Sequence, residues 1–185
     1  SDLVTGVQTC ALPIYGMGGL RHGLWSATQA VQAFIEAYQA KGADEAVPAA
    51  LQRALRAANA VVHGQAVQLD LVDRMGTTLA AAVVRGLELH WLNVGDSRVY
   101  LVEDGHLLCL STDHRYAEVL LQRVHRGEMS AGEALGHPLR EALTSYLGRP
   151  EPLVQAAGGF RFHNSMSQCC VMGATDLHPS VSLTL

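Results

Sequence analysis

The sequence lacks three features that would each assign it to a familiar class. Its 13 Lys and Arg are scattered and are outnumbered by 17 Asp and Glu, so there is no basic stripe of the kind that neutralises a nucleic-acid backbone. No uninterrupted apolar run approaches the roughly 18 residues of a membrane-spanning helix, and the N-terminus lacks the basic and apolar segments of a signal peptide. We therefore expect neither nucleic acid nor a membrane as a partner.

Cysteine is also sparse. The four cysteines are Cys10, Cys109, Cys169 and Cys170, which form neither a CxxC metal-binding spacing nor a disulfide framework. This distribution fits a reducing compartment, so the expected localisation is cytoplasmic. Internal repeats and low-complexity linkers are absent as well. With 185 residues, 49% of them hydrophobic, the chain is expected to form one domain with a buried core and to act as a monomer.

The first 14 residues are not expected to belong to the domain formed by the rest of the chain. Residues 4–14 read VTGVQTCALPI, which resembles the translation of a common sequencing-library adaptor, and such segments are excluded from fold reasoning. The alternative is a genuine short strand and turn that ends at Pro13. We expect residues 1–14 to be non-native and residues 15–185 to form a single incomplete domain.

Two amphipathic helices and a series of short strands are predicted next. Apolar residues three and four positions apart indicate one helix from Leu20 to about Ala40 and another from about Glu45 to His63. Farther on, Thr, Val, Leu and Tyr become frequent, and breaks at Arg85-Gly86 and Asp104-Gly105 are typical of consecutive hairpins. The predicted strands are 77–84, 88–94, 98–103 and 106–110.

The strand at 88–94 has apolar residues on both faces. Leu89 and Trp91 share one face, and Leu92 and Val94 share the other. A strand that is apolar on both sides is expected in a sheet covered by another sheet on one side and by helices on the other.

The second half of the chain is less regular. Short helices are predicted near 116–126 and 130–135, and Ser130 with Glu133 fits a capping box at the start of the latter. From Pro150 onward no clear periodicity appears.

Candidate functional residues surround a Gly-Asp pair. Gly95-Asp96 follows a predicted strand, where a carboxylate can face a cleft without the cost of burial in the core. Alone this pair is weak evidence, because Gly and Asp are common turn residues. The flanking motifs, in chain order, are Gly16-Met17-Gly18-Gly19, Met75-Gly76-Thr77-Thr78, Asn93-Val94-Gly95-Asp96-Ser97-Arg98-Val99-Tyr100-Leu101 and Ser111-Thr112-Asp113-His114.

In that order and at those separations the motifs resemble the PPM family, the type 2C metal-dependent serine/threonine protein phosphatases, and especially its compact bacterial members. The resemblance continues through His125-Arg126-Gly127-Glu128, Ala134, His137-Pro138-Leu139-Arg140 and Leu143-Thr144-Ser145-Tyr146-Leu147-Gly148, a segment similar to the flap of the family. It implies an α+β fold, namely a four-layer α-β-β-α sandwich of two antiparallel sheets flanked by helices. Here the sandwich is expected to be truncated, within a phosphatase-like domain at 15–185.

The resemblance also implies a site with two or three Mn²⁺ or Mg²⁺ ions. Hard cations of this kind take oxygen ligands and activate water for attack on a phosphate monoester. Carried over by motif, the ligands are the carbonyl of Gly16, Asp96, and Asp176 in the segment Val171-Met172-Gly173-Ala174-Thr175-Asp176. No other residue is expected to act directly in catalysis. The implied partners are a phosphorylated protein substrate and an opposing serine/threonine kinase.

Two departures from the family pattern affect the expected activity. Tyr15 stands where an aspartate that bridges both metals is expected, and Met172 replaces the first aspartate of the late motif. Neither a phenol nor a thioether is a suitable ligand for Mg²⁺. The expected function is therefore phosphoserine and phosphothreonine hydrolysis, impaired in this chain. The alternatives are an inactive pseudophosphatase that binds phosphoprotein or a partner, and a structural α/β sandwich in which Asp96 is only a turn residue.

Overall fold

A computed structural model describes residues 7–10, 19–103, 105–150, 152–162, 168–172 and 181–184. The helices are α1 (Gly19–Gln39), α2 (Val47–Gln68), α3 (Tyr116–His125) and α4 (Ala131–Leu135). The strands are β1 (Val7–Cys10), β2 (Leu79–Arg85), β3 (Glu88–Val94), β4 (Arg98–Glu103), β5 (His106–Cys109), β6 (Ala156–Arg161), β7 (Gln168–Met172) and β8 (Val181–Thr184).

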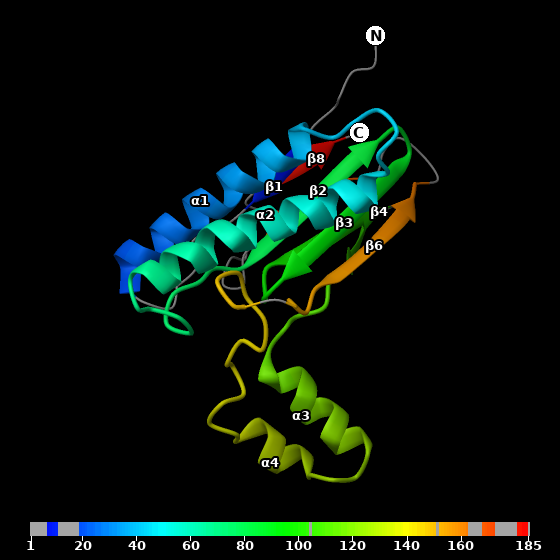
Figure 1. The fold of residues 1–185 in the computed structure, drawn as a ribbon. Coiled ribbons are helices and arrows are strands. Elements are labelled where there is room, and N and C mark those ends of the chain that lie inside the picture. The colour runs from blue at the N-terminus through cyan, green and yellow to red at the C-terminus, as the bar shows by residue number, and fades with distance from the viewer. Residues whose placement is uncertain are drawn as a thin grey trace.

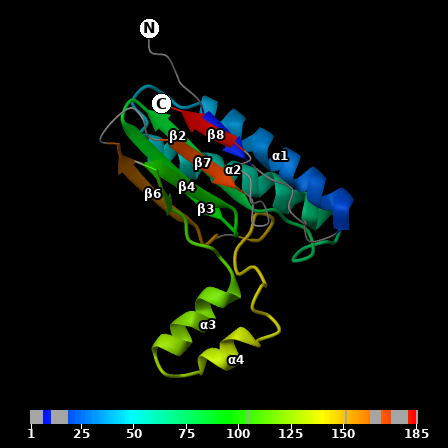
Figure 2. The same ribbon diagram turned by 180° about the vertical axis from the view of Figure 1, so that it is seen from behind.

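Two antiparallel sheets and one pair of helices form the body of the molecule. The first sheet has the strand order β1-β2-β3-β6, and the second has the order β5-β4-β7-β8. Helices α1 and α2 lie side by side across the first sheet (Figure 1), and the second sheet lies behind it (Figure 2). The expected α+β sandwich of two antiparallel sheets is thus confirmed.

The described residues form three of the four expected layers. Within these ranges no helix covers the outer face of the β5-β4-β7-β8 sheet (Figure 2). Helices α3 and α4 instead extend from one end of the sandwich (Figure 1). They pack on each other, and we call residues 115–144 the arm.

Strand β2 contributes to both hydrophobic cores. Its residues alternate between the helix layer and the second sheet, as the pleat of a strand requires. The core under the helices includes Phe34, Leu55, Val62, Leu79, Ala81, Val83, Leu92 and Val94, all at most 5% exposed. The core between the sheets includes Ala80, Ala82, Val84, Leu89, Val99, Leu101 and Phe162. The predicted two-sided burial of 88–94 is confirmed by the separation of Leu89 from Leu92 and Val94.

The helix and strand predictions up to residue 135 agree with the structure within a few residues. The main difference is α2, which continues to Gln68 instead of ending at His63. The prediction ended the helix before Gly64, but a glycine inside a helix costs only about 1 kcal/mol. Ala66 is fully buried in the added turn, and its packing offsets that cost.

Three strands after residue 150 were not predicted. Strand β6 reads AAGGFR, a composition with weak strand propensity. It forms because it pairs with β3 and accommodates Trp91, whose indole lies 2.9 Å from the position that a Cβ on Gly158 would occupy. Strand β7 pairs with β4 so that Met172 lies opposite Arg98. The late motif therefore starts beside the Asp96 turn.

The N-terminal segment includes β1, which pairs with β2 from Val7↔Val83 to Cys10↔Ala80. This strand agrees with the alternative of a genuine short strand. Pairing does not test whether residues 1–14 are native, so the domain boundary stays a prediction. Among the described residues, no helix combines the length and the apolarity that crossing a bilayer requires.

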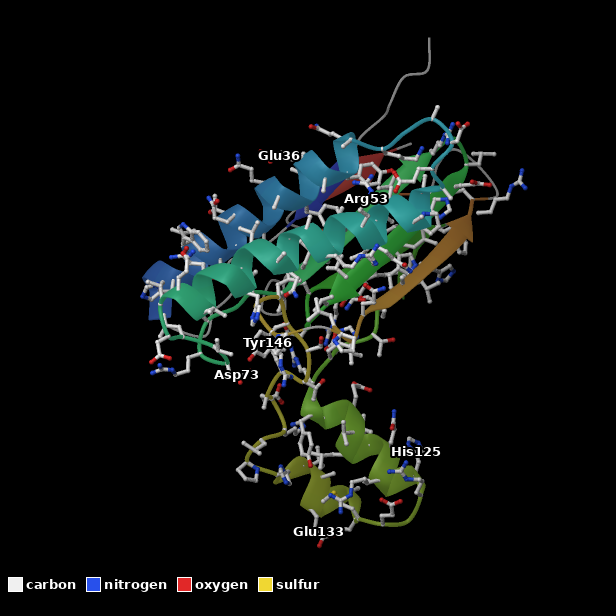
Figure 3. The ribbon with its side chains drawn as sticks, in the orientation of Figure 1. Glu36, Arg53, Asp73, His125, Glu133 and Tyr146 are labelled. Carbon is white, nitrogen blue, oxygen red and sulfur yellow. The ribbon has the colours of Figure 1, made fainter. Side chains whose placement is uncertain are left out.

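The arm has its own local determinants. The predicted capping box is confirmed: the Glu133 amide donates to the Ser130 hydroxyl at 3.2 Å, and the Ser130 amide donates to the Glu133 carboxylate at 2.8 Å. Glu133 lies on α4 at the far end of the arm, and His125 lies at the end of α3 (Figure 3). Leu120 and Ala134 are buried between the two helices.

Candidate functional site

The motifs at 75–78 and 93–101 meet at the end of the sandwich from which the arm extends. Thr77 and Leu147 exchange two backbone hydrogen bonds of 3.1 and 2.8 Å, which join the motif at 75–78 to the segment after the arm. The hydroxyls of Thr78 and Ser97 lie 2.7 Å apart, which joins the same motif to the Asp96 turn. These contacts therefore bring together residues from three separate segments.

The turn before Asp96 requires glycine. Gly95 has a φ of +92°, which side chains disfavour. A Cβ at this position would also lie 2.3 Å from Cγ2 of Thr78. The close packing of Gly95 against Thr78 fixes where the chain leaves β3 and hence where Asp96 starts.

The segment 111–114 is bonded to this turn through both backbone and side chains. His114 donates its amide to the Gly95 carbonyl at 2.9 Å, and the Gly95 amide donates to Nδ1 of His114 at 3.0 Å. Asn93 donates from Nδ2 to the Thr112 carbonyl at 2.9 Å. Burial lowers the pKa of His114, while its hydrogen bond with the Gly95 backbone and the charge of Asp113 act in the opposite direction. The imidazole is therefore held neutral as a hydrogen-bond acceptor.

Asp96 lies in a cluster of charged side chains. Arg115 donates from Nε to Oδ2 of Asp96 at 3.0 Å and from Nη1 to Glu141 at 2.9 Å. Its Nε also lies 3.7 Å from Asp113. The side chains of Asp96 and Arg115 are only 16% and 20% exposed, so water screens this ion pair less than one on the open surface.

Arg98 binds the next carboxylate in the cluster. Its Nε and Nη2 donate to the two oxygens of Asp113 at 2.8 and 2.5 Å, and Nη1 donates to the Tyr100 hydroxyl at 3.3 Å. This bidentate contact, followed by the Tyr100 bond, raises the pKa of Arg98 above its ordinary value. Asp113 therefore pairs with Arg98, and the hydrogen bonds of Arg115 go to Asp96 and Glu141.

The segment that follows the arm is bonded to α2 and to the loop after α2. The Asn59 side chain bonds both the Gly148 amide and the Arg149 carbonyl, at 2.8 and 3.0 Å. The Tyr146 hydroxyl donates to Asp73 at 3.3 Å (Figure 3). The base of the arm is thus fixed to the sandwich on both of its chain segments.

The donor chemistry of Asp96 fits a single hard cation. Carboxylate oxygens are preferred ligands of Mg²⁺ and Mn²⁺, and the buried Asn93 Oδ1 has no hydrogen-bond partner among the described residues. Within the same residues, no group of three or more His, Cys, Asp or Glu side chains is placed to hold a metal ion. The described part of the site therefore offers one carboxylate, Asp96, which is already paired with Arg115, and does not supply a ligand set for two adjacent ions.

Of the three predicted ligands, the structure describes only Asp96. Gly16 and Asp176 lie outside the described residues, as does Tyr15, so their assignments stay predictions. Sequence reasoning assigned no individual role to Asn93 or Arg98, although both lie in the motif at 93–101, and it did not identify Arg115 at all. The position of Arg115 directly after the motif that ends at His114 was the only signal available.

The comparisons with known proteins point in one direction. Residues 14–123 match the family model described as Protein phosphatase 2C. The chain is 34% identical over 138 residues to the serine/threonine phosphatase stp of Listeria monocytogenes serotype 4b (strain F2365), a match that covers 72% of this chain and 53% of that protein. The chain thus spans about half the length of this relative.

Solved structures agree with the fold. A Stage II Sporulation E family protein from Thermanaerovibrio acidaminovorans superposes with a TM-score of 0.67 at 29% identity, over 88% of this chain and 73% of that one. The catalytic domain of the serine/threonine phosphatase PstP, in complex with two manganese ions, superposes with a TM-score of 0.62 at 23% identity, over 90% and 70% of the two chains. At that identity the second comparison bears on the fold alone.

Proposed function

The chain belongs to the protein phosphatase 2C family, and on that basis we propose that its function is the hydrolysis of phosphoserine and phosphothreonine in proteins, impaired in this chain. The observation that carries the proposal is the family match over residues 14–123, which contains the Gly95-Asp96 turn at the centre of the polar cluster. Asp96, Asp176 and the carbonyl of Gly16 would hold Mn²⁺ or Mg²⁺. When bound, such an ion neutralises phosphate charge and activates water for attack.

The residues of the cluster have defined parts in this proposal. The Gly95 turn places Asp96 beside Arg115, and the neutral His114 keeps that turn in place by accepting a hydrogen bond from the Gly95 amide. Arg98 neutralises Asp113, so that Asp96 is the acidic group left for a cation once Arg115 moves. Support for the metal comes from membership of the protein phosphatase 2C family, which the match over residues 14–123 shows.

The expected impairment follows from the sequence at two positions. Tyr15 and Met172 replace the aspartates that the resemblance implies, and an ion pair with Arg115 already neutralises Asp96. We propose that a phosphorylated protein is the substrate, that a serine/threonine kinase opposes the reaction, and that the chain acts as a cytoplasmic monomer. The cysteine distribution, which fits a reducing compartment, supports the cytoplasmic location.

The test is an assay on p-nitrophenyl phosphate and on a phosphothreonine peptide with Mn²⁺. We expect turnover close to background for this chain, and a gain that depends on Mn²⁺ when Tyr15→Asp and Met172→Asp are combined. Mn²⁺-dependent turnover of the unmodified chain that Asp96→Ala abolishes would overturn the proposed impairment. A repaired chain with neither turnover nor a thermal shift on Mn²⁺ addition would favour the structural sandwich.

A second candidate function is a pseudophosphatase that binds phosphoprotein without hydrolysis. The Arg115–Asp96 pair favours it, because a guanidinium already occupies the carboxylate that a catalytic ion would need. Binding of the phosphothreonine peptide without turnover, measured by fluorescence anisotropy in the repaired and unmodified chains, would separate this function from catalysis.

A further inference from the structure

Strand β6 forms an edge of the first sheet beside α2. It pairs with β3 on one side, and no strand among the described residues pairs with its other side. In Figure 1 this edge lies on the side of α2 that faces away from α1. An edge strand leaves the N–H and C=O groups of every second residue without a ladder partner. The sequence AAGGFR contains neither proline nor lysine, which often protect such an edge, so β6 is open to another strand.

An apolar groove lies between this edge and the first turns of α2. Its volume is about 370 Å³, which is within the range of protein sites that take up a ligand. The residues that α2 and β6 contribute to its walls are Pro48, Leu51, Gln52, Ala157 and Gly159. All of these except Leu51 are exposed, so the groove is open to solvent.

The register of β6 explains why the groove exists. Ala157 lies opposite Leu92, and Gly159 lies opposite His90. Residues directly opposite each other share a face of the sheet, and Leu92 belongs to the core under the helices. Ala157 and Gly159 therefore face α2, and their methyl group and hydrogen are too small to fill the space between the strand and the helix.

The two glycines of β6 differ in what they contact. A Cβ at Gly158 would lie 2.9 Å from the indole of Trp91, so Gly158 is required for that packing. A Cβ at Gly159 would lie 3.5 Å from Nδ1 of His90, which is an ordinary van der Waals contact. The hydrogen at Gly159 therefore leaves room that a larger side chain could occupy.

Two arginines flank the groove. Arg56 lies one helical turn after Gln52 on α2, and Arg161 ends β6. Both are exposed, and neither forms an ion pair with another residue in the described part of the chain. Glu88 is opposite Arg161 in the register, but its carboxylate lies 3.6 Å from the imidazole of His90. In a chain of net charge -4, these two guanidinium groups favour an acidic ligand at this place.

A second copy of the chain would not fill the groove. If two β6 strands paired antiparallel about a twofold axis, each would present only Ala157, Gly159 and Arg161 on the face toward α2 of the other. None of these is a large apolar side chain. The pairing would also bring Arg161 of one copy toward the arginines of the other, and like charges repel. The groove instead fits a segment with larger apolar side chains and negative charge.

We propose that this groove binds an extended segment of a partner protein by strand addition. The segment pairs with the open edge of β6, places apolar side chains from positions i and i+2 between β6 and α2, and carries acidic residues for Arg56 and Arg161. In this mode backbone hydrogen bonds give affinity, and sites for alternate side chains give specificity. Because β6 has six residues, the paired segment is about six residues long. The inference does not depend on the metal site or on hydrolysis.

The first experiment selects ligands on the unmodified chain from a phage-displayed library of random octapeptides. Enriched sequences should carry apolar residues at alternate positions, flanked by Asp or Glu. Their affinity is then measured by fluorescence anisotropy. Gly159→Leu should weaken binding at least about tenfold, because the new side chain fills the site of an apolar side chain of the peptide. Gly64→Leu is the matched control, because it adds the same side chain to α2 where nothing lies within 4 Å, and affinity should change by less than about twofold.

Charge variants test the same groove without changing its shape, and they decide the question if Gly159→Leu does not fold. Arg56→Glu and Arg161→Glu should each weaken binding by about three- to tenfold. Arg126→Glu, at a position 59% exposed on the arm, should leave the affinity unchanged. Failure to enrich any sequence, or enriched peptides that bind all variants equally, would overturn the proposal.

Hydrogen exchange distinguishes strand addition from other modes of binding. An enriched peptide should slow amide exchange in β6 and leave exchange unchanged in β5, the edge strand of the other sheet. Equal effects in the two strands, or none in either, would contradict strand addition. A dimer that forms without peptide and protects β6 would assign this edge to a second copy and also overturn the proposal.

The same peptides separate this inference from the proposed function. Their binding should be equal with and without Mn²⁺ and in Asp96→Ala, so failure of the proposed metal site would leave the groove proposal standing. Mn²⁺-dependent turnover in the chain repaired at Tyr15 and Met172, together with no peptide binding, would overturn the groove proposal alone.

Discussion

The side chain of Asn59 on α2 holds the backbone around Gly148, 89 residues away in the sequence. Its Oδ1 accepts from the Gly148 amide at 2.8 Å, and its Nδ2 donates to the Arg149 carbonyl at 3.0 Å. Asn59 is 2% exposed, so water cannot replace these bonds. This contact fixes the segment that returns from the arm against the helix layer.

Replacing Asn59 with alanine should destabilise the fold. Asn59→Ala leaves the buried Gly148 amide without its partner, and we expect the free energy of unfolding to fall by about 2–3 kcal/mol in urea denaturation. Gln52→Ala is the matched control, because Gln52 is exposed on the same helix and its loss should change stability by less than about 0.5 kcal/mol. Equal effects in the two variants would contradict the importance of this contact.

The turn before Asp96 should not tolerate a side chain. Gly95→Ala combines a positive φ with a Cβ 2.3 Å from Thr78 Cγ2, so we expect a loss of more than about 2 kcal/mol or insoluble protein. Gly86→Ala also has a positive φ, of +59°, but nothing lies within 4 Å of its added Cβ. It should cost only about 1 kcal/mol of backbone strain. Thermal unfolding of both variants is the measurement, and similar melting temperatures would contradict the steric argument.

Stability should fall as the pH drops below about 6.5, the ordinary pKa of histidine. Burial lowers the pKa of His114 in the folded chain, so the unfolded chain binds the proton more readily and acid favours unfolding. The stability is fully present above the unfolded pKa and declines toward the folded one, by up to about 1.4 kcal/mol for each unit between them.

The His114 effect can be isolated with two variants. His114→Asn keeps an acceptor for the Gly95 amide but does not titrate, so its unfolding free energy should change less between pH 7 and pH 5 than that of the unmodified chain. His106→Asn removes an exposed histidine and should keep the original slope. A slope in His114→Asn as steep as in the unmodified chain would assign the acid sensitivity to other groups.

The capping box of α4 should stabilise the arm without affecting the sandwich. Ser130→Ala removes the hydroxyl that accepts from the Glu133 amide, and we expect the local opening free energy of α4 to fall by about 1 kcal/mol. Hydrogen exchange should therefore quicken at 131–135 and stay unchanged in β2 and β3. Faster exchange throughout the sandwich would show that the arm and the sheets unfold together.

Periodicity and turn residues were enough to predict most of the local structure. The strands at 88–94 and 98–103 were placed at their observed bounds, because alternation and the glycine turns between them are short-range signals. Strand β6 could not be found in the same way. Its Gly158 and Gly159 oppose strand formation by propensity, and only pairing with β3 and contact with Trp91 stabilise it.

The candidate site, like the fold, was predicted only where the signal is local in the sequence. The motifs identified Asp96 and placed it at the end of a strand, because residue types and order are properties of the chain alone. The ion pair with Arg115 was not predicted, since it depends on the Gly95–His114 bonds that bring two loops 19 residues apart into register.

The sequence by itself determined the family, the order of the elements through α4 and the acidic turn at Asp96, because each follows from local patterns. The tertiary structure decided which positively charged side chain contacts Asp96, how the arm is bonded to the sandwich and which late segments become strands. Those features depend on hydrogen bonds and packing between distant segments, such as Asn59 with Gly148, and exist only once the sheets and helices have assembled.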